Sequence, residues 1–145
     1  MKQRFFLLYI LASLCLAGYS AIGQALPAGI YKFYPKEMGE QAAGFQIIRP
    51  DSSSHYWSED TPNILQERAT ITYAGDLVIF NTSIIMVGNA DGVQVYEDVV
   101  QKFRVVARHA PGFVEVIKVE EIDDGVVTTM DDPRVFVFRQ ICETY

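Results

Sequence analysis

The side chains best suited to recognising a ligand lie close together in the first half of the chain. Trp57 is the only tryptophan of the 145-residue sequence, and it follows His55 and Tyr56 within a polar stretch, residues 52–60. Aromatic side chains in a polar context commonly mark surfaces that contact ligands or partners. We therefore expect Trp57, Tyr56, His55 and the earlier Tyr31 to be ligand-binding residues. The competing interpretation is that Trp57 closes one end of the core.

The sequence predicts no metal site. His55 and the two acids that follow it, Glu59 and Asp60, offer one nitrogen and two oxygens, but zinc ligands usually have a better-defined spacing. The aspartate pairs at 123–124 and 131–132 lack the alternating oxygen ligands and the distal glutamate of an EF-hand loop. Both pairs lie beside glycine or proline, so they are more typical of turns.

No catalytic residue is predicted either. The serines at 52–54 place hydroxyl groups beside His55, but a serine hydrolase needs a positioned nucleophile, a separately oriented base and an oxyanion hole. The sequence has no glycine-rich phosphate loop, no CxxC pair and no basic stripe. We expect no cofactor, and an enzyme is the least favoured class of protein.

The first 25 residues have the pattern of a secretory signal peptide. Lys2 and Arg4 precede an apolar run over residues 5–18, and small residues lead from there to Ala25. The run is shorter than the roughly 20 apolar residues of a membrane-spanning helix. We expect cleavage after Gly23 or Ala25. The mature chain, residues 26–145, is then a single exported domain, periplasmic or secreted, without a stable membrane anchor.

Cleavage also changes the charge and the cysteine content. The loss of Lys2 and Arg4 takes the net charge from −6 to −8, which makes nucleic acid and anionic lipid poor partners. Cys15 follows the bulky Leu14, whereas a lipid-bearing cysteine follows a small residue. Cys142 then remains as the only cysteine. We expect it to be buried, the commoner state of a free cysteine, or else to pair between chains.

The elements that position these residues are predicted to be β-strands, because apolar residues alternate with a period of two between clusters of Gly, Pro, Asn and Asp. We expect strands at 29–34, 44–49, 55–57, 69–74, 77–80, 84–87, 93–108, 113–122, 126–130 and 134–141. Residues 58–68 predict a loop with at most one helical turn, and residues 81–83 a bulge or a break. Residues 97–108 also fit a helix, but their β-branched side chains favour a strand.

The turns recur every 8–12 residues, a spacing typical of all-β sandwiches and barrels. We expect an antiparallel meander of about eight or nine strands. An open meander would expose two edges, so we expect it to close as a small barrel of lipocalin-like architecture or, as second choice, to form a two-sheet sandwich. The resemblance is one of architecture alone, because Gly29-Ile30-Tyr31 has a tyrosine where the lipocalin Gly-x-Trp signature has tryptophan.

Two functional classes follow from this architecture. The first is a binding module that holds a small apolar or mixed ligand inside a closed β-structure. The alternative is a non-catalytic cell-envelope domain, with a structural role or with another envelope protein as its partner. A cavity of a few hundred cubic ångströms favours the first class, and a filled core favours the second.

The signal-peptide interpretation makes a direct prediction. We expect N-terminal sequencing of the mature protein from its own host to begin at Gln24 or Leu26, and mass spectrometry to find no lipid. A mature protein that retains Met1, or that carries a lipid on Cys15, would contradict this interpretation.

Overall fold

The computed structural model describes residues 25–58, 65–89, 91–131 and 133–143. The predicted signal peptide, apart from Ala25, lies outside the described residues, and so do Glu59 and Asp60. The described chain forms nine strands and one short 3-10 turn. They are β1 (Gly29–Pro35), η1 (Glu40–Ala42), β2 (Gly44–Ile48), β3 (Ser53–Trp57), β4 (Leu65–Ala74), β5 (Leu77–Asn89), β6 (Gly92–Ala110), β7 (Phe113–Asp123), β8 (Val126–Thr129) and β9 (Val135–Cys142).

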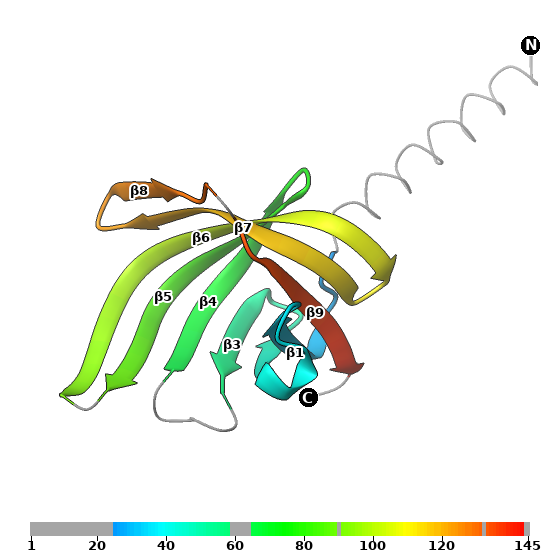
Figure 1. Ribbon diagram of the computed structural model, residues 1–145, viewed down its shortest axis with the longest axis horizontal. Helices are drawn as coiled ribbons and strands as arrows, with labels where there is room; N and C mark the ends of the chain where they lie inside the picture. The colour runs from blue at the N-terminus through cyan, green and yellow to red at the C-terminus, as the bar shows by residue number, and fades with distance from the viewer. Residues whose placement is uncertain (1–24, 59–64, 90, 132, 144–145) are drawn as a thin grey trace, which may run out of the picture.

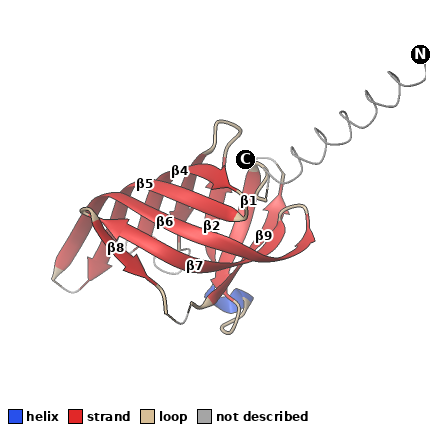
Figure 2. Ribbon diagram, turned by 90° about the horizontal axis from the view of Figure 1, so that it is seen from above, coloured by secondary structure: helices blue, strands red, loops and turns tan. Residues whose placement is uncertain are grey.

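Eight of these strands form a closed antiparallel barrel. Each strand from β1 to β7 pairs with the next one, and β9 pairs with both β7 and β1. The short β8 pairs only with the end of β7 and lies outside the ring (Figure 2). The prediction of an all-β meander barrel is therefore confirmed, and residues 97–108 belong to strand β6. Among the described residues no helix is long and apolar enough to cross a membrane.

One predicted strand limit was wrong. Strand β4 begins at Leu65 rather than after Arg68, because its polar first residues pair with β5, as in the pair Gln66–Met86. Of the two alternatives for residues 81–83, the bulge is confirmed: residues 77–89 form one strand, in which Ser83 is the extra residue between the pairs Arg68–Ile84 and Ala69–Thr82. A bulge of this kind bends a strand without ending it.

The first half of β6 lies outside the core. Val93 and Val95 are 61% and 54% exposed. They belong to the part of β6 that pairs with β5 alone, because the pairing of β6 with β7 begins only at Val100. Cys142, expected to be buried or else to pair between chains, is exposed at the end of β9, so the predicted burial was wrong.

The interior of the barrel is aromatic. The rings of Phe33 and Phe138 lie 4.5 Å apart between their centroids, and those of Phe33 and Phe136 lie 5.1 Å apart. Phe80 stacks on Phe138 at 6.0 Å, and Phe103 meets Phe80 edge to face at 5.5 Å. These rings come from β1, β5, β6 and β9, so the closure of the barrel brings them together.

Residues 25–28 close one end of this interior. Leu26 is 2% exposed, and its carbonyl oxygen accepts a hydrogen bond of 3.1 Å from the Tyr73 hydroxyl. The Tyr31 hydroxyl donates to the carbonyl oxygen of Pro27. Gln140 donates from Nε2 to the carbonyl oxygen of Ala28 at 3.1 Å. The segment before β1 is thus held against the barrel by hydrogen bonds from three different strands.

Tyr56 points to the inside of the barrel and packs over Gly44. A Cβ atom on Gly44 would overlap the Tyr56 ring, and that ring meets Phe33 edge to face at 5.9 Å. Gly44 has no positive φ, so glycine is not required there for its backbone conformation. It is required because a side chain would block the close approach of the Tyr56 ring.

We expect Gly44→Ala to destabilise the protein by roughly 1–3 kcal/mol, the usual cost of overpacking. Urea unfolding measures this change. In a Tyr56→Ala background the same substitution should cost much less, because the two residues are in contact. Equal costs in the two backgrounds would contradict the proposed packing.

Candidate functional site

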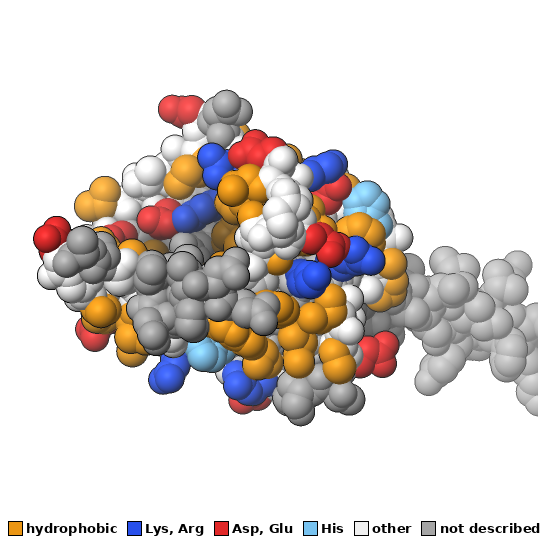
Figure 3. All heavy atoms as spheres, turned by 60° about the horizontal axis from the view of Figure 1, so that its bottom comes forward, with side chains coloured by type: hydrophobic (Ala, Val, Ile, Leu, Met, Phe, Trp, Pro, Cys, Tyr) orange, Lys and Arg blue, Asp and Glu red, His pale blue; other side chains and the backbone are white. Residues whose placement is uncertain are grey.

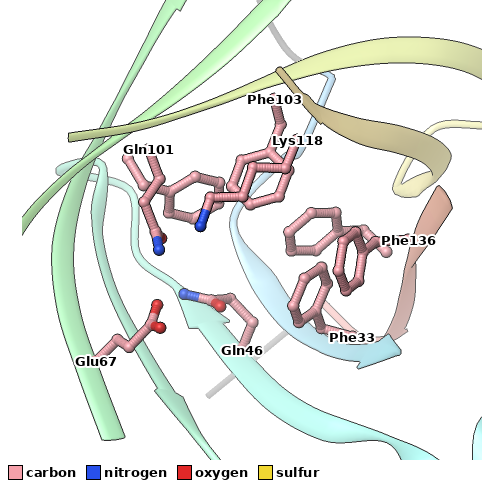
Figure 4. A pocket seen from close by; sticks show the side chains of 9 residues that line it. Phe33, Gln46, Glu67, Gln101, Phe103, Lys118 and Phe136 are labelled. Carbon is pink, nitrogen blue, oxygen red and sulfur yellow. The ribbon is translucent and has the colours of Figure 1, made fainter. Parts of the chain in front are cut away.

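The barrel contains a cavity of about 170 Å³. Nine side chains line it, five of them phenylalanines and four of them polar. They are Phe33, Phe80, Phe103, Phe136 and Phe138, with Gln46, Glu67, Gln101 and Lys118 (Figure 4). The cavity therefore has an aromatic side and a polar side.

The aromatic side is a set of packed rings. Phe33 stacks on Phe136, while Phe103 stands edge-on to both, at 6.4 Å and 6.2 Å between centroids. Packed aromatic rings favour an offset or edge-on ring as a further neighbour. This side of the cavity can therefore accept a flat apolar group.

The polar side contains an amide that no other described side chain bonds. Gln46 is only 4% exposed, lines the cavity, and its side chain makes no hydrogen bond with the described part of the chain. Gln101, by contrast, donates from Nε2 to Glu121 at 3.3 Å. The Gln46 amide is not among the fully buried atoms without a partner. It therefore keeps some accessible surface and can hydrogen-bond to a molecule inside the cavity.

Glu67 places a carboxylate on the same side. Burial raises the pKa of Glu67 above its usual value, Lys118 acts to lower it, and Glu121 raises it further. Lys118 itself forms an ion pair with Glu121. Although burial acts to raise the pKa of Glu121, the hydrogen bond and charge of Lys118 lower it overall. The charge of Lys118 is thus already matched by Glu121, and Glu67 has no ion pair among the described residues.

The predicted site residues do not come together around this cavity. Successive side chains of a strand point to opposite faces, so Tyr56 lies inside against Phe33 while its neighbours His55 and Trp57 lie on the outer wall. There the Trp57 ring lies 5.6 Å from His55 and stacks on Phe45 at 5.6 Å.

Tyr31 is fully buried and meets Phe138 edge to face at 6.3 Å between centroids. Its hydroxyl is bonded to the backbone near the closed end of the barrel. Burial, with a smaller effect from Tyr73, raises its pKa well above the usual range. Neither Tyr31 nor Tyr56 is among the residues that line the cavity.

Sequence reasoning missed the four polar residues of the cavity. The available signal was a polar residue at an inward position of an otherwise apolar strand. Gln46 lies two residues from Ile48, and Lys118 follows Val114 and Val116, which are almost fully buried. Glu67 gave no such signal, because its segment was interpreted as a loop.

Comparisons of the chain with protein-family models, curated proteins and solved structures give no match. The residues that the structure describes contain no group of three or more His, Cys, Asp or Glu side chains placed to hold a metal ion. The chemistry of the cavity is therefore argued from its own side chains.

We expect Glu67→Gln to stabilise the protein at pH 7, because the raised pKa means that the fold disfavours the ionised carboxylate. The stabilising effect of the protonated form is complete below the unfolded-state value of 4.5 and is lost as the pH rises through the folded-state pKa. The melting temperature should rise by roughly 2–5 °C at pH 7, the shift that about 1 kcal/mol produces in a domain of this size.

Differential scanning fluorimetry across pH tests this expectation. The gain should disappear below about pH 4, where Glu67 is protonated in both states. Glu97→Gln, the same change at an exposed position of β6, is the matched control. A variant that is less stable than the unmodified protein at pH 7 would show that Glu67 is well compensated in the fold.

Proposed function

We propose that the barrel is a binding module for a small ligand that has an apolar body and a polar end. The observation that carries the proposal is the combination of Gln46 and Glu67, both facing an aromatic cavity and neither hydrogen-bonded within it. Both side chains line the cavity, so a ligand inside it can hydrogen-bond to both.

The size of the cavity limits the ligand. A dry cavity of about 150 Å³ accommodates benzene, whereas pockets for drug-sized molecules occupy roughly 300–1,000 Å³. At about 170 Å³, the cavity fits one ring with a short substituent. Figure 4 shows Phe33 and Phe136 on one side of the cavity and Gln46 and Glu67 on the other. The phenylalanines would contact the ring of such a ligand, and its substituent would point to Gln46 and Glu67.

The charges of the cavity favour a substituent that donates hydrogen bonds. Glu67 is an acceptor when ionised, and Gln46 both accepts and donates. Since Lys118 is paired with Glu121, the remaining charge facing the ligand is negative. A hydroxyl or an amine is therefore favoured over a carboxylate. We place this binding outside the cytoplasm, in the periplasm or in the secreted protein, on the pattern of the first 25 residues.

An envelope interaction domain is the second candidate function. It is favoured by the apolar side chains exposed on the strands that extend beyond the ring. Val126 and Val127 on β8 are 66% and 57% exposed, and Val93 and Val95 on β6 are similarly open. Exposed apolar residues on a sheet edge are typical of surfaces that pair with another chain.

Calorimetric titration with benzyl alcohol, benzylamine, benzoate and toluene tests the binding module. We expect benzyl alcohol and benzylamine to bind in the micromolar to millimolar range, and toluene and benzoate about tenfold or more weakly, because one lacks donors and the other is repelled by Glu67. Glu67→Gln should lower the affinity for benzylamine by about tenfold, and Glu97→Gln should leave it unchanged. If none of the four probes binds, the cavity is not a binding site for this class of ligand.

A further inference from the structure

The basic residues of this acidic protein are unevenly paired. Ten lysines and arginines lie within the described chain. Seven of them form ion pairs with carboxylates: Lys32, Lys36, Lys102, Arg104, Lys118, Arg134 and Arg139. Figure 3 shows the same tendency on one face of the molecule, where most basic side chains lie beside acidic ones. Arg49, Arg68 and Arg108 form no ion pair with another described residue.

Two of these three arginines meet in one depression on the outer wall of the barrel. The depression has a volume of about 370 Å³ and lies over the end of β2 and strands β3, β4 and β5. Its lining includes Arg49, Arg68 and His55, with hydroxyl groups from Ser53, Thr70 and Ser83. No carboxylate lines it.

Strand register forces the basic groups together. His55 pairs directly with Arg68 across β3 and β4, and Ser53 pairs with Thr70. Arg49 donates its backbone N–H to the carbonyl oxygen of Ser53 at 2.9 Å, which holds it beside the same strand. Arg49 and Arg68 are separated by β3, so their positive charges face one depression without standing directly opposite each other, and their mutual repulsion is unfavourable.

The state of His55 reflects this cost. Burial lowers its pKa below the usual value, the charges of Arg68 and Arg49 lower it further, and a hydrogen bond with Gln66 opposes them. Its Nε2 atom is buried and has no hydrogen-bond partner. The nearest acid in sequence, Asp51, accepts a hydrogen bond from the backbone N–H of Ser53 at 2.9 Å. The hydrogen bonds of Ser53 and, to a smaller extent, the charge of Arg49 lower the pKa of Asp51, but Asp51 does not line the depression.

We propose that this outer depression binds an oxyanion of the phosphate or sulfate type. The planar guanidinium groups of Arg49 and Arg68 are suited to paired hydrogen bonds with such a group. The same charge that makes the empty site costly then stabilises the complex. The site is separate from the interior cavity, because its residues occupy the outward positions of the strands whose inward positions hold Gln46 and Glu67.

Trp57 provides a direct readout of this site. It is the only tryptophan of the chain, and its ring lies 5.6 Å from His55. Titration with inorganic phosphate and with sulfate, at constant ionic strength set by chloride, should change the tryptophan fluorescence in a saturable way. Calorimetry of the same titration gives the dissociation constant independently.

Three matched variants decide between a built site and a general charge effect. We expect Arg49→Gln and Arg68→Gln each to weaken binding about tenfold or more, as for the loss of a charge-assisted hydrogen bond. Arg108→Gln removes the third arginine without an ion pair, on the exposed part of β6, and should change the affinity by less than about twofold. Equal losses in all three variants, or a signal that chloride reproduces, would overturn the proposal.

A phosphate group can also come from a lipid, so the titration is repeated with phosphatidylcholine vesicles containing about one fifth phosphatidylglycerol. The site is supported if Arg49→Gln and Arg68→Gln abolish binding in either experiment and Arg108→Gln retains it. The experiment in which binding occurs shows whether the anion is free in solution or part of a lipid headgroup. Binding in neither experiment overturns the proposal. The interior cavity is tested separately with benzylamine, so that result does not depend on this one.

Discussion

The pairing of β9 with both β7 and β1 is the constraint on which the rest of the structure depends. Phe138 pairs with Phe33 of β1 on one side and with Val114 of β7 on the other. Closure therefore removes the two free edges of the sheet and turns the phenylalanines of the two strands toward each other. Since aromatic burial contributes much of the stability of a small core, the ring and its interior are stabilised by the same contacts.

The closed barrel has a mostly apolar interior, so each polar side chain that points into it needs a partner or a function. The inward positions of β2, β4, β6 and β7 include Gln46, Glu67, Gln101 and Lys118 among apolar neighbours. Gln101 and Lys118 are both bonded to Glu121. Gln46 and Glu67 are hydrogen-bonded neither to each other nor to these three residues. Polar groups that face a pocket and have no structural partner are typical of binding sites. The aromatic side accounts for the fold and the polar side for the proposed recognition.

Local patterns in the sequence predicted the strands and turns, because alternation and turn residues act over a few positions. They also predicted a strand at residues 97–108, where β-branched side chains outweighed the helical spacing. These local patterns failed where the structure or exposure of a segment depends on a neighbouring strand that is distant in the sequence. The polar start of β4 is a strand only because β5 lies beside it, and Val93 is exposed only because the pairing of β7 with β6 starts at Val100. The site prediction grouped His55 and Trp57 with Tyr56, although alternation within a strand sends Tyr56 to the other face.

Strand β4 connects the two proposed sites. It has no extra residue, and its regular alternation, in which Ala69 and Ile71 are buried, directs Glu67 to the cavity and Arg68 to the outer wall. The extra residue Ser83 lies in the partner strand, where it lets β5 present both Phe80 and Ile85 to the interior. Ser83 also donates its hydroxyl hydrogen bond to the carbonyl oxygen of Arg68 at 3.1 Å and lines the outer depression. One strand therefore supplies a carboxylate to the interior and a guanidinium group to the outer wall, because neighbouring side chains point to opposite faces.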